Sequence, residues 1–186
     1  MLVTVIVLVV VLVIVVFGVI GFNKLRSADI GAQEALGGID VQLTRRADLI
    51  PNLVETVKGY AAHEKSVFEE ITRARAGVQQ AAAGHDVPAK AAADAQLQGA
   101  LANINAVAEN YPDLKASQNF IDLQRQLADT ENQISFARQY YNDAVARLNR
   151  LVATIPWLLL VGLAGVSKRD FYDAPAGQEQ APQVSF

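Results

Sequence analysis

The side chains that most often carry chemistry do not form a catalytic or metal-binding pattern in this sequence. His63-Glu64 is followed by Lys65-Ser66-Val67, so the second histidine of the HExxH zinc motif is missing. The other histidine, His85, stands in a loop-like segment, and no Glu-x-x-His pair of a di-iron bundle occurs. The chain has no cysteine, which excludes thiolate metal sites and disulfides. We therefore predict no catalytic residue, no metal, no cofactor and no enzymatic activity.

Two polar groups interrupt stripes of apolar residues where helix packing is expected. Arg45, Arg46 and Asp48 form the first group, and Arg46 falls on the expected packing face. The second group is 130–132, in the last long helix. If the helices run antiparallel, Arg46 lies within a turn of Glu131, which predicts a contact between Arg45 or Arg46 and Glu131. Such a contact is either an ion pair that sets helix register, with little net stability, or part of a site for a partner.

The elements that must position these groups are helices. Ala, Leu, Gln, Glu and Arg are abundant after residue 27, and this composition favours helix. Apolar residues recur every three or four positions, which places one stripe on each helix, as in bundle packing. The stripes are Leu25, Ala32, Leu36, Ile39, Leu43, Ile50, Val54 and Val57; Ala61, Phe68, Ile71 and Val78; Leu97, Leu101, Ile104 and Ala108; and Phe120, Leu123, Leu127, Thr130, Ile134, Ala137, Tyr141, Val145, Leu148, Val152 and Ile155. The predicted fold class is all-α: an N-terminal transmembrane helix, then an antiparallel four-helix bundle with long first and last helices.

Breaks between the helices are few. Residues 84–88 form a loop in which Asp86 can cap a helix that has Pro88 in its first turn. A second break lies at 110–113, so helices are expected over 88–110 and 114–155. The first reversal is ambiguous, because Pro51 could end or kink a helix. Helix lengths place the reversal between Gly59 and Glu64 and make Pro51 a kink, and one kinked helix from the membrane to Ala83 stays an alternative.

The charged residues at 69–75 have no spacing typical of a functional site. Arg73 and Arg75 are flanked by Glu69 and Glu70. Mixed charges of this kind are typical of a solvated helix face.

The hydrophobic residues, 52% of the chain, are concentrated at its start. Met1 to Phe22 carry no charge and are nearly all apolar, and about 22 helical residues span about 33 Å, the thickness of a bilayer core. A cleaved signal peptide is the alternative, but no basic residue precedes the run and no good cleavage site follows it. Lys24 and Arg26 flank the run, so the positive-inside rule places the N-terminus outside and the domain inside. Gly18 and Gly21 could let anchors pack laterally, although they lack GxxxG spacing.

A second apolar block, too short to span, lies at 156–166, followed by Lys168 and Arg169. It is either an interfacial segment at the headgroups or a cap over the open end of the bundle. The candidate interfacial residues are Trp157, Leu158, Lys168, Arg169, Phe171 and Tyr172. The predicted parts of the chain are a transmembrane anchor at 1–22, a helical bundle at 23–155, an apolar or interfacial segment at 156–172 and a flexible tail at 173–186.

Three stretches, in order, resemble motifs of the LemA family of bacterial membrane-anchored helical proteins. They are 39–60 (IDVQLTRRADLIPNLVETVKGY) with His63-Glu64 after it, 106–115 (AVAENYPDLK) and 130–142 (TENQISFARQYYN). The resemblance covers roughly residues 24–172. It implies an N-terminal anchor, an N-out topology and an antiparallel four-helix domain, and it supplies no activity and no catalytic residues. The chain departs from the family at 156–166, where the family is usually more polar, and this difference favours a membrane contact there.

The leading functional hypothesis is a non-enzymatic scaffold or adaptor that associates with itself at the bacterial inner membrane. The alternative is a sensor or regulatory subunit that binds a ligand or a membrane enzyme near 45–51. The expected partners are the lipid bilayer and either further copies of the chain or other membrane proteins; a net charge of −3 argues against nucleic acid. The candidate structural or partner-site residues are Arg45, Arg46, Asp48, Pro51, Asn52, Tyr111, Pro112, Glu131, Asn132, Arg138, Tyr141 and Asn142.

Overall fold

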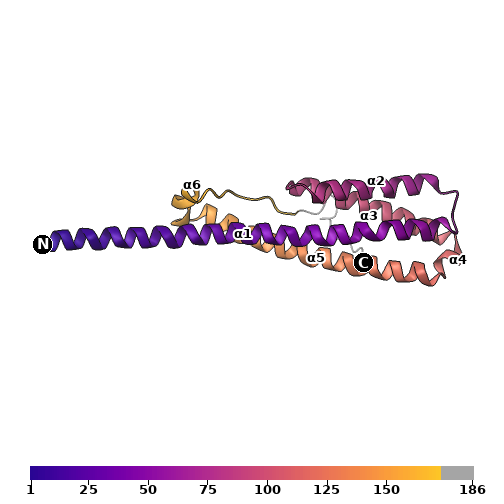
Figure 1. Ribbon diagram of the computed structural model, residues 1–186, viewed down its shortest axis with the longest axis horizontal. Coiled ribbons are helices and arrows are strands. Elements are labelled where there is room, and N and C mark those ends of the chain that lie inside the picture. Colours follow the sequence, from indigo (N-terminus) through magenta and orange to yellow (C-terminus); the bar gives the residue numbers. More distant parts are fainter. Residues whose placement is uncertain (173–186) are drawn as a thin grey trace, which may run out of the picture. The chain divides into compact units, whose positions relative to one another are not determined.

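The computed structural model describes residues 1–172, and within this range it is helical and has no strand. The predicted tail at 173–186 lies outside the described residues. The elements are α1 (Leu2–Lys58), α2 (Lys65–Ala82), α3 (Val87–Glu109), α4 (Pro112–Lys115), α5 (Gln118–Ala153), the 3-10 turn η1 (Trp157–Leu160) and α6 (Val161–Ala164) (Figure 1). The prediction of an all-helical chain that begins with a long apolar helix is confirmed.

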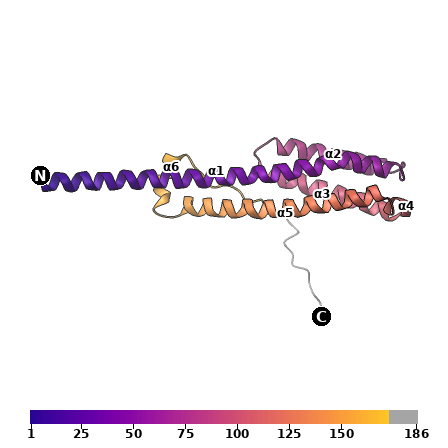
Figure 2. The same cartoon turned by 60° about the horizontal axis from the view of Figure 1, so that its bottom comes forward.

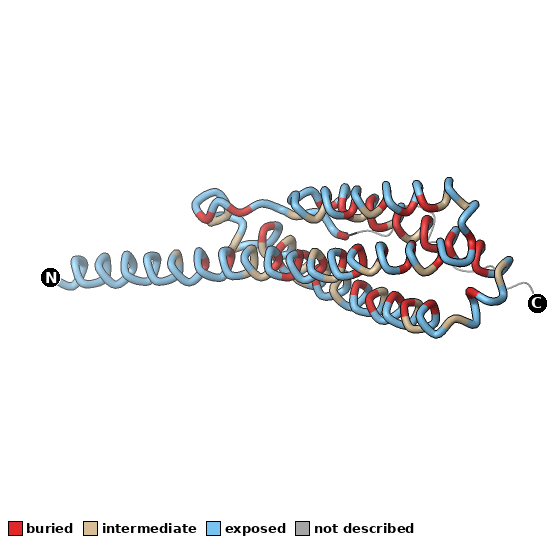
Figure 3. The backbone as a smooth tube through the Cα atoms, turned by 45° about the vertical axis from the view of Figure 1, so that its right-hand side comes forward, coloured by how far each residue is buried: buried red, intermediate tan, exposed pale blue. Residues whose placement is uncertain are grey.

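The chain divides into two compact units. The anchor unit comprises residues 1–36 and 139–171, and the core unit comprises residues 37–138 and Tyr172. In the core unit, α2 packs along α3 (Figure 1 and Figure 2). Buried residues recur along one side of each helix (Figure 3), as the three- and four-residue spacing predicts.

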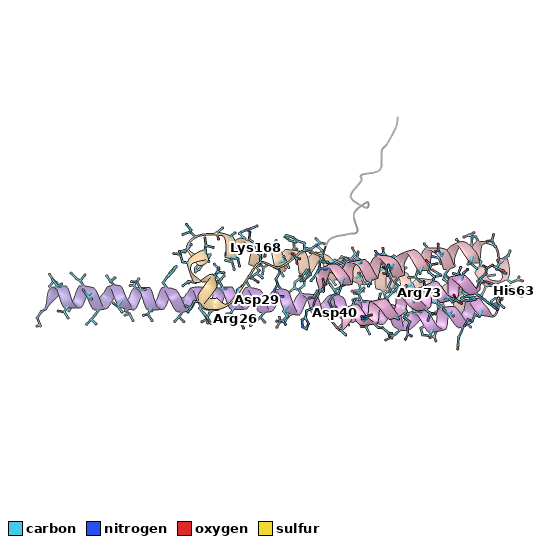
Figure 4. The ribbon with its side chains drawn as sticks, turned by 90° about the horizontal axis from the view of Figure 1, so that it is seen from above. Arg26, Asp29, Asp40, His63, Arg73 and Lys168 are labelled. Atoms are coloured by element: carbon cyan, nitrogen blue, oxygen red, sulfur yellow. The ribbon has the colours of Figure 1, made fainter. Side chains whose placement is uncertain are left out.

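The loops of the core unit agree with the sequence at two places. The turn between α1 and α2 falls within 59–64, as the length arithmetic predicts, and His63 lies in it (Figure 4). Asp86 caps α3, because its carboxylate accepts the Ala89 N–H at 3.2 Å, with Pro88 in the first turn.

The last long helix begins and ends differently from the prediction. Its expected start at 114 is wrong, because α4 ends at Lys115 and α5 begins at Gln118. Ser117, a residue type that favours helix starts, accepts the Ile121 N–H with its carbonyl at 3.1 Å. The expected end at 155 is also wrong, because α5 stops at Ala153 and Ile155 is 78% exposed. A residue before proline is pushed out of the helical region, so Ile155 cannot continue the stripe.

Pro51 lies inside α1 and does not end it. Proline has no N–H, so the carbonyl four residues earlier, that of Ala47, loses its partner within the helix. Arg75 of α2 donates its Nε–H to this carbonyl at 3.0 Å, and Ala47 is buried. The prediction of a solvated face is therefore wrong for Arg75, whose side chain replaces the hydrogen bond that Pro51 removes, whereas Arg73 is exposed (Figure 4).

In the anchor unit, η1 packs against the end of the apolar run of α1. The ring of Trp157 stacks on Phe17 with centroids 5.7 Å apart, and the Lys24 ammonium lies 4.5 Å from the Trp157 ring centroid. A Cβ at Gly21 would collide with the Leu160 side chain and come within 3.2 Å of the Trp157 ring, so a larger residue there would force these side chains to shift. Gly21 is therefore covered and unavailable for lateral packing, contrary to the prediction, whereas Gly18 is open.

The residues that follow α6 run along α5 in the anchor unit. Gly165 turns the chain in the left-handed region, with φ at 62°. The Asn149 amide exchanges two hydrogen bonds of 2.9 Å with the backbone of Arg169, and the Tyr141 hydroxyl donates to the Asp170 carbonyl at 2.9 Å. The Arg169 guanidinium binds Asp29 of α1 at 2.8 Å. These bonds fix the segment at 169–170 to both helices of the anchor unit.

Candidate functional site

A buried carboxylate on α3 is the centre of a charge network in the core unit. Asp94 is fully buried and accepts a hydrogen bond of 2.9 Å from Nη1 of Arg46, on α1. Its second oxygen accepts a hydrogen bond from Nη2 of Arg138, on α5. One carboxylate therefore joins three helices, and two guanidinium groups compensate its burial.

Arg46 also binds Glu131, so the predicted contact is present. Its Nη2 donates to Glu131 on α5, whereas Arg45 is exposed. The Gln98 amide on α3 holds the same carboxylate, with hydrogen bonds of 3.0 and 3.1 Å to its two oxygens. Arg46 is thus shared between two carboxylates, and we name Arg46, Asp94, Gln98, Glu131 and Arg138 the ionic cluster.

Tyr172 of the core unit lies next to the ionic cluster. It is 3% exposed, its hydroxyl lies 3.5 Å from Asp94 Oδ2, and the Arg138 guanidinium lies 5.2 Å from its ring centroid. Burial and the neighbouring Asp94 charge raise the pKa of Tyr172, so it stays a neutral phenol that can donate to Asp94. The prediction of an interfacial position is wrong for Tyr172, because the core unit buries it.

The electrostatics of Arg138 follow from the same carboxylate. Burial acts to lower the pKa of Arg138, but the charge of Asp94 and its hydrogen bond outweigh burial, so the pKa is raised. Arg138 therefore remains a cation. The Nε atoms of Arg46 and Arg138 are buried and have no acceptor among residues 1–172, so both side chains depend on the carboxylates that bind their terminal nitrogens.

A second buried ion pair lies on the same helix one turn before Asp94. Lys90 is fully buried, its ammonium binds Asp40 of α1, and it also donates to the Ala82 carbonyl of α2 at 3.1 Å. The sequence did not predict Lys90, Asp94 or Gln98 as members of a buried charge network. A signal existed for Asp94, because it lies three residues before Leu97 and therefore continues the third apolar stripe by one turn.

Within the described part of the core unit, the other candidate residues do not belong to the ionic cluster. In the core unit, Tyr111 is half-buried, and its hydroxyl donates to Glu64 at 3.3 Å. Tyr141 and Asn142 belong to the anchor unit, where Tyr141 is buried. The remaining exposed candidates of the core unit are Arg45, Asp48, Pro51, Asn52, Pro112 and Asn132.

The candidate interfacial residues of the anchor unit differ in how exposed they are. Trp157 contacts α1 and Leu158 is 48% exposed, which leaves the interfacial prediction for them untouched. Lys168 and Phe171 are also exposed, whereas Arg169 is partly covered by its bonds to Asp29 and Asn149.

The ionic cluster joins α1, α3 and α5 of the core unit through paired charges. The grooves found on the core unit are open and shallow, and none of them is lined by a member of the ionic cluster. The groove beside Asn52, of about 350 Å³, is lined by amides and by Glu55 and Asp122. Within residues 1–172, no group of three or more His, Asp or Glu side chains is placed to hold a metal ion.

Within residues 1–172, the all-helical arrangement, the exposed apolar helix at its start and the charges paired in its core define a class of helical protein in which α1 is long and apolar enough to cross a membrane. The sequence profile of the LemA family matches residues 35–186. The chain belongs to the LemA family.

The chain is also similar to magnetosome proteins of two bacterial species. The chain is 25% identical over 179 residues to the magnetosome protein MamQ of Magnetospirillum gryphiswaldense, an alignment that covers 82% of this chain and 66% of that protein. It is 24% identical over 180 residues to the magnetosome proteins MamQ 1 and MamQ 2 of Paramagnetospirillum magneticum, covering 84% of this chain and 66% of each. The chain thus spans slightly less than two thirds of the length of these relatives.

Proposed function

We propose that the chain is a single-pass protein of the bacterial cytoplasmic membrane that acts as a non-enzymatic scaffold and associates with copies of itself. In this proposal residues 1–22 are the anchor, with the N-terminus outside. Residues 23–155 form an antiparallel four-helix bundle on the cytoplasmic side. Residues 156–172 lie at the headgroups, except for Tyr172, which belongs to the core.

The observation that carries the proposal is the exposed apolar surface at the start of α1. From Met1 to Ile20 every large apolar side chain is at least 40% exposed, and these side chains lie on all faces of the helix. A water-soluble protein rarely exposes a contiguous apolar surface of this size. At about 1.5 Å per residue the run has the length of a bilayer core, so lipid is the partner that would cover it.

The ionic cluster supports a scaffold over a ligand sensor. Arg46 is 4% exposed and shared between Asp94 and Glu131, so it has no free face to offer a ligand. A network of this kind sets helix register without forming a pocket. The likeness to proteins named as magnetosome proteins is compatible with a structural role, by analogy alone.

Self-association is proposed through the anchor. Gly18 has no atom within 4 Å of the position its Cβ would take, so a second helix could approach its backbone closely there. Gly21 does not contribute, because Trp157 and Leu160 cover it.

Two full-length copies with different affinity tags test the proposal. We expect that after cross-linking in native membranes one tag captures the other, and that Gly18→Leu reduces the captured fraction several-fold because it blocks close approach. Val19→Leu, which places the same leucine side chain one residue away on another face of the helix, is the matched control and should leave capture unchanged. If the copies do not co-purify, and the purified full-length protein is a strict monomer at all concentrations, self-association is excluded.

A further inference from the structure

A groove of about 600 Å³ lies on the surface of the anchor unit between α1 and α5. On α1 it is lined by one helical face that includes Lys24 and Ser27, and on α5 by a face that includes Tyr140, Arg147 and Arg150. Its floor is made of small or apolar residues, Ala28, Gly31, Ala144 and Leu151. The groove therefore combines an apolar floor with cationic and hydroxyl side chains at its edges.

The charges of the groove are not neutralised. It holds three cations, Lys24, Arg147 and Arg150, and one carboxylate, that of Asp143. Among the ion pairs found in residues 1–172, none involves Arg147 or Arg150, whereas Arg26 and Arg169 both pair with Asp29. Lys24 is placed by the Trp157 ring, which does not cancel its charge. The groove thus presents an excess of positive charge to an external anion.

The groove lies at the end of the apolar run. Lys24 is two residues after Phe22, and Trp157, four residues beyond the end of α5, contacts both Phe17 and Lys24. The Arg150 end of the groove therefore faces the apolar segment within the anchor unit. The anchor unit is also the positively charged part of the chain, since it has a net charge of +2 and the rest of the chain has −5.

We propose that this groove binds the phosphate of an anionic phospholipid headgroup in the leaflet next to Lys24. Arg147 and Arg150 would bind the phosphate oxygens, Ser27 and Tyr140 offer hydroxyl donors, and the acyl chains would follow the apolar run of α1. A lipid fits better than a free anion, because a lipid phosphate is held at the depth of Lys24 by its own acyl chains. The inference rests on the membrane anchoring proposed above.

The single tryptophan makes the site measurable. Trp157 is the only tryptophan of the chain and contacts Lys24 at the end of the groove. Full-length protein in neutral detergent micelles is titrated with phosphatidylglycerol whose acyl chains carry bromine, which quenches tryptophan fluorescence on contact. We expect quenching at mole fractions about 30-fold lower than with brominated phosphatidylcholine. We also expect Arg147→Gln with Arg150→Gln to abolish this difference, since each basic side chain near an anionic surface contributes about fivefold.

Three controls make the outcome decisive. Arg73→Gln with Arg125→Gln removes two exposed arginines of the core unit and should leave the titration unchanged. Arg147→Lys with Arg150→Lys keeps the charge and should retain most of the preference for phosphatidylglycerol, which separates loss of binding from loss of fold. Inorganic phosphate at millimolar concentration should not displace the lipid, and displacement would overturn the assignment to a lipid.

Equal quenching by the two lipids would overturn the proposal that the groove binds an anionic phospholipid. A preference that survives the Arg147→Gln and Arg150→Gln changes would overturn it too. Failure of the anchoring is seen separately, because a chain without a membrane span is released from membranes by alkaline carbonate. A chain that resists carbonate but does not distinguish the two lipids is anchored and lacks the lipid site.

Discussion

Replacing Asp94 by alanine should lower the free energy of unfolding of the core unit by about 3–5 kcal/mol, the cost of removing one partner from a buried ion pair. The Asp94 carboxylate is fully buried and accepts from both Arg46 and Arg138. Without it, the Arg138 guanidinium loses its carboxylate, and Arg46 keeps only Glu131. Two cations would then remain in a core with one partly exposed anion to balance them.

Amide hydrogen exchange along α3 of the full-length protein in micelles measures this loss, because buried helical amides exchange through opening of the core. Asp48→Ala is the matched control, since Asp48 is an exposed aspartate of the same unit, and it should change the free energy by less than about 0.5 kcal/mol. Equal exchange rates in the two variants would show that the ionic cluster does not hold the core together.

The second large effect is expected at Arg75. Arg75→Met should cost about 1–3 kcal/mol, because it leaves the buried Ala47 carbonyl without a donor. In a Pro51→Ala background the same substitution should cost little, because the N–H of the alanine at position 51 can bond to the Ala47 carbonyl along the helix. The two substitutions are therefore predicted to be strongly non-additive.

A double-mutant cycle on the unfolding free energy measures this coupling. We expect a coupling energy of at least about 1 kcal/mol, with Arg73→Met on the same helix as a control that changes nothing in either background. If Arg75→Met costs the same with proline and with alanine at position 51, Arg75 does not compensate the proline.

The sequence predicted the helices better than the contacts between them. The spacing of apolar residues depends only on the helical repeat, so the buried stripes from Leu43 to Val57 and from Leu97 to Ala108 could be predicted. The cap at Asp86 and the turn at 59–64 are likewise local. Ser117 was missed because serine is compatible with a helix interior as well as with a helix start.

The candidate site could be predicted only in part. The Arg46–Glu131 contact followed from an assumed antiparallel register, because both residues interrupt apolar stripes. Asp94 was not found, because its partners lie on α1 and α5 and no local pattern marks it apart from its place on a stripe. The charges around Arg75 predict a solvated side chain, because only the tertiary structure shows that the carbonyl freed by Pro51 faces α2.

We propose that the first helix crosses the bilayer and leaves the helical domain on the cytoplasmic side. The chain has no cysteine, so single cysteines can be introduced one at a time and modified with a membrane-impermeant maleimide in bacterial spheroplasts. We predict that Leu2→Cys is modified in intact spheroplasts, and that Ala128→Cys, at an exposed position of α5, is modified only after the membrane is opened. Modification of Ala128→Cys in intact spheroplasts would contradict the cytoplasmic position of the helical domain.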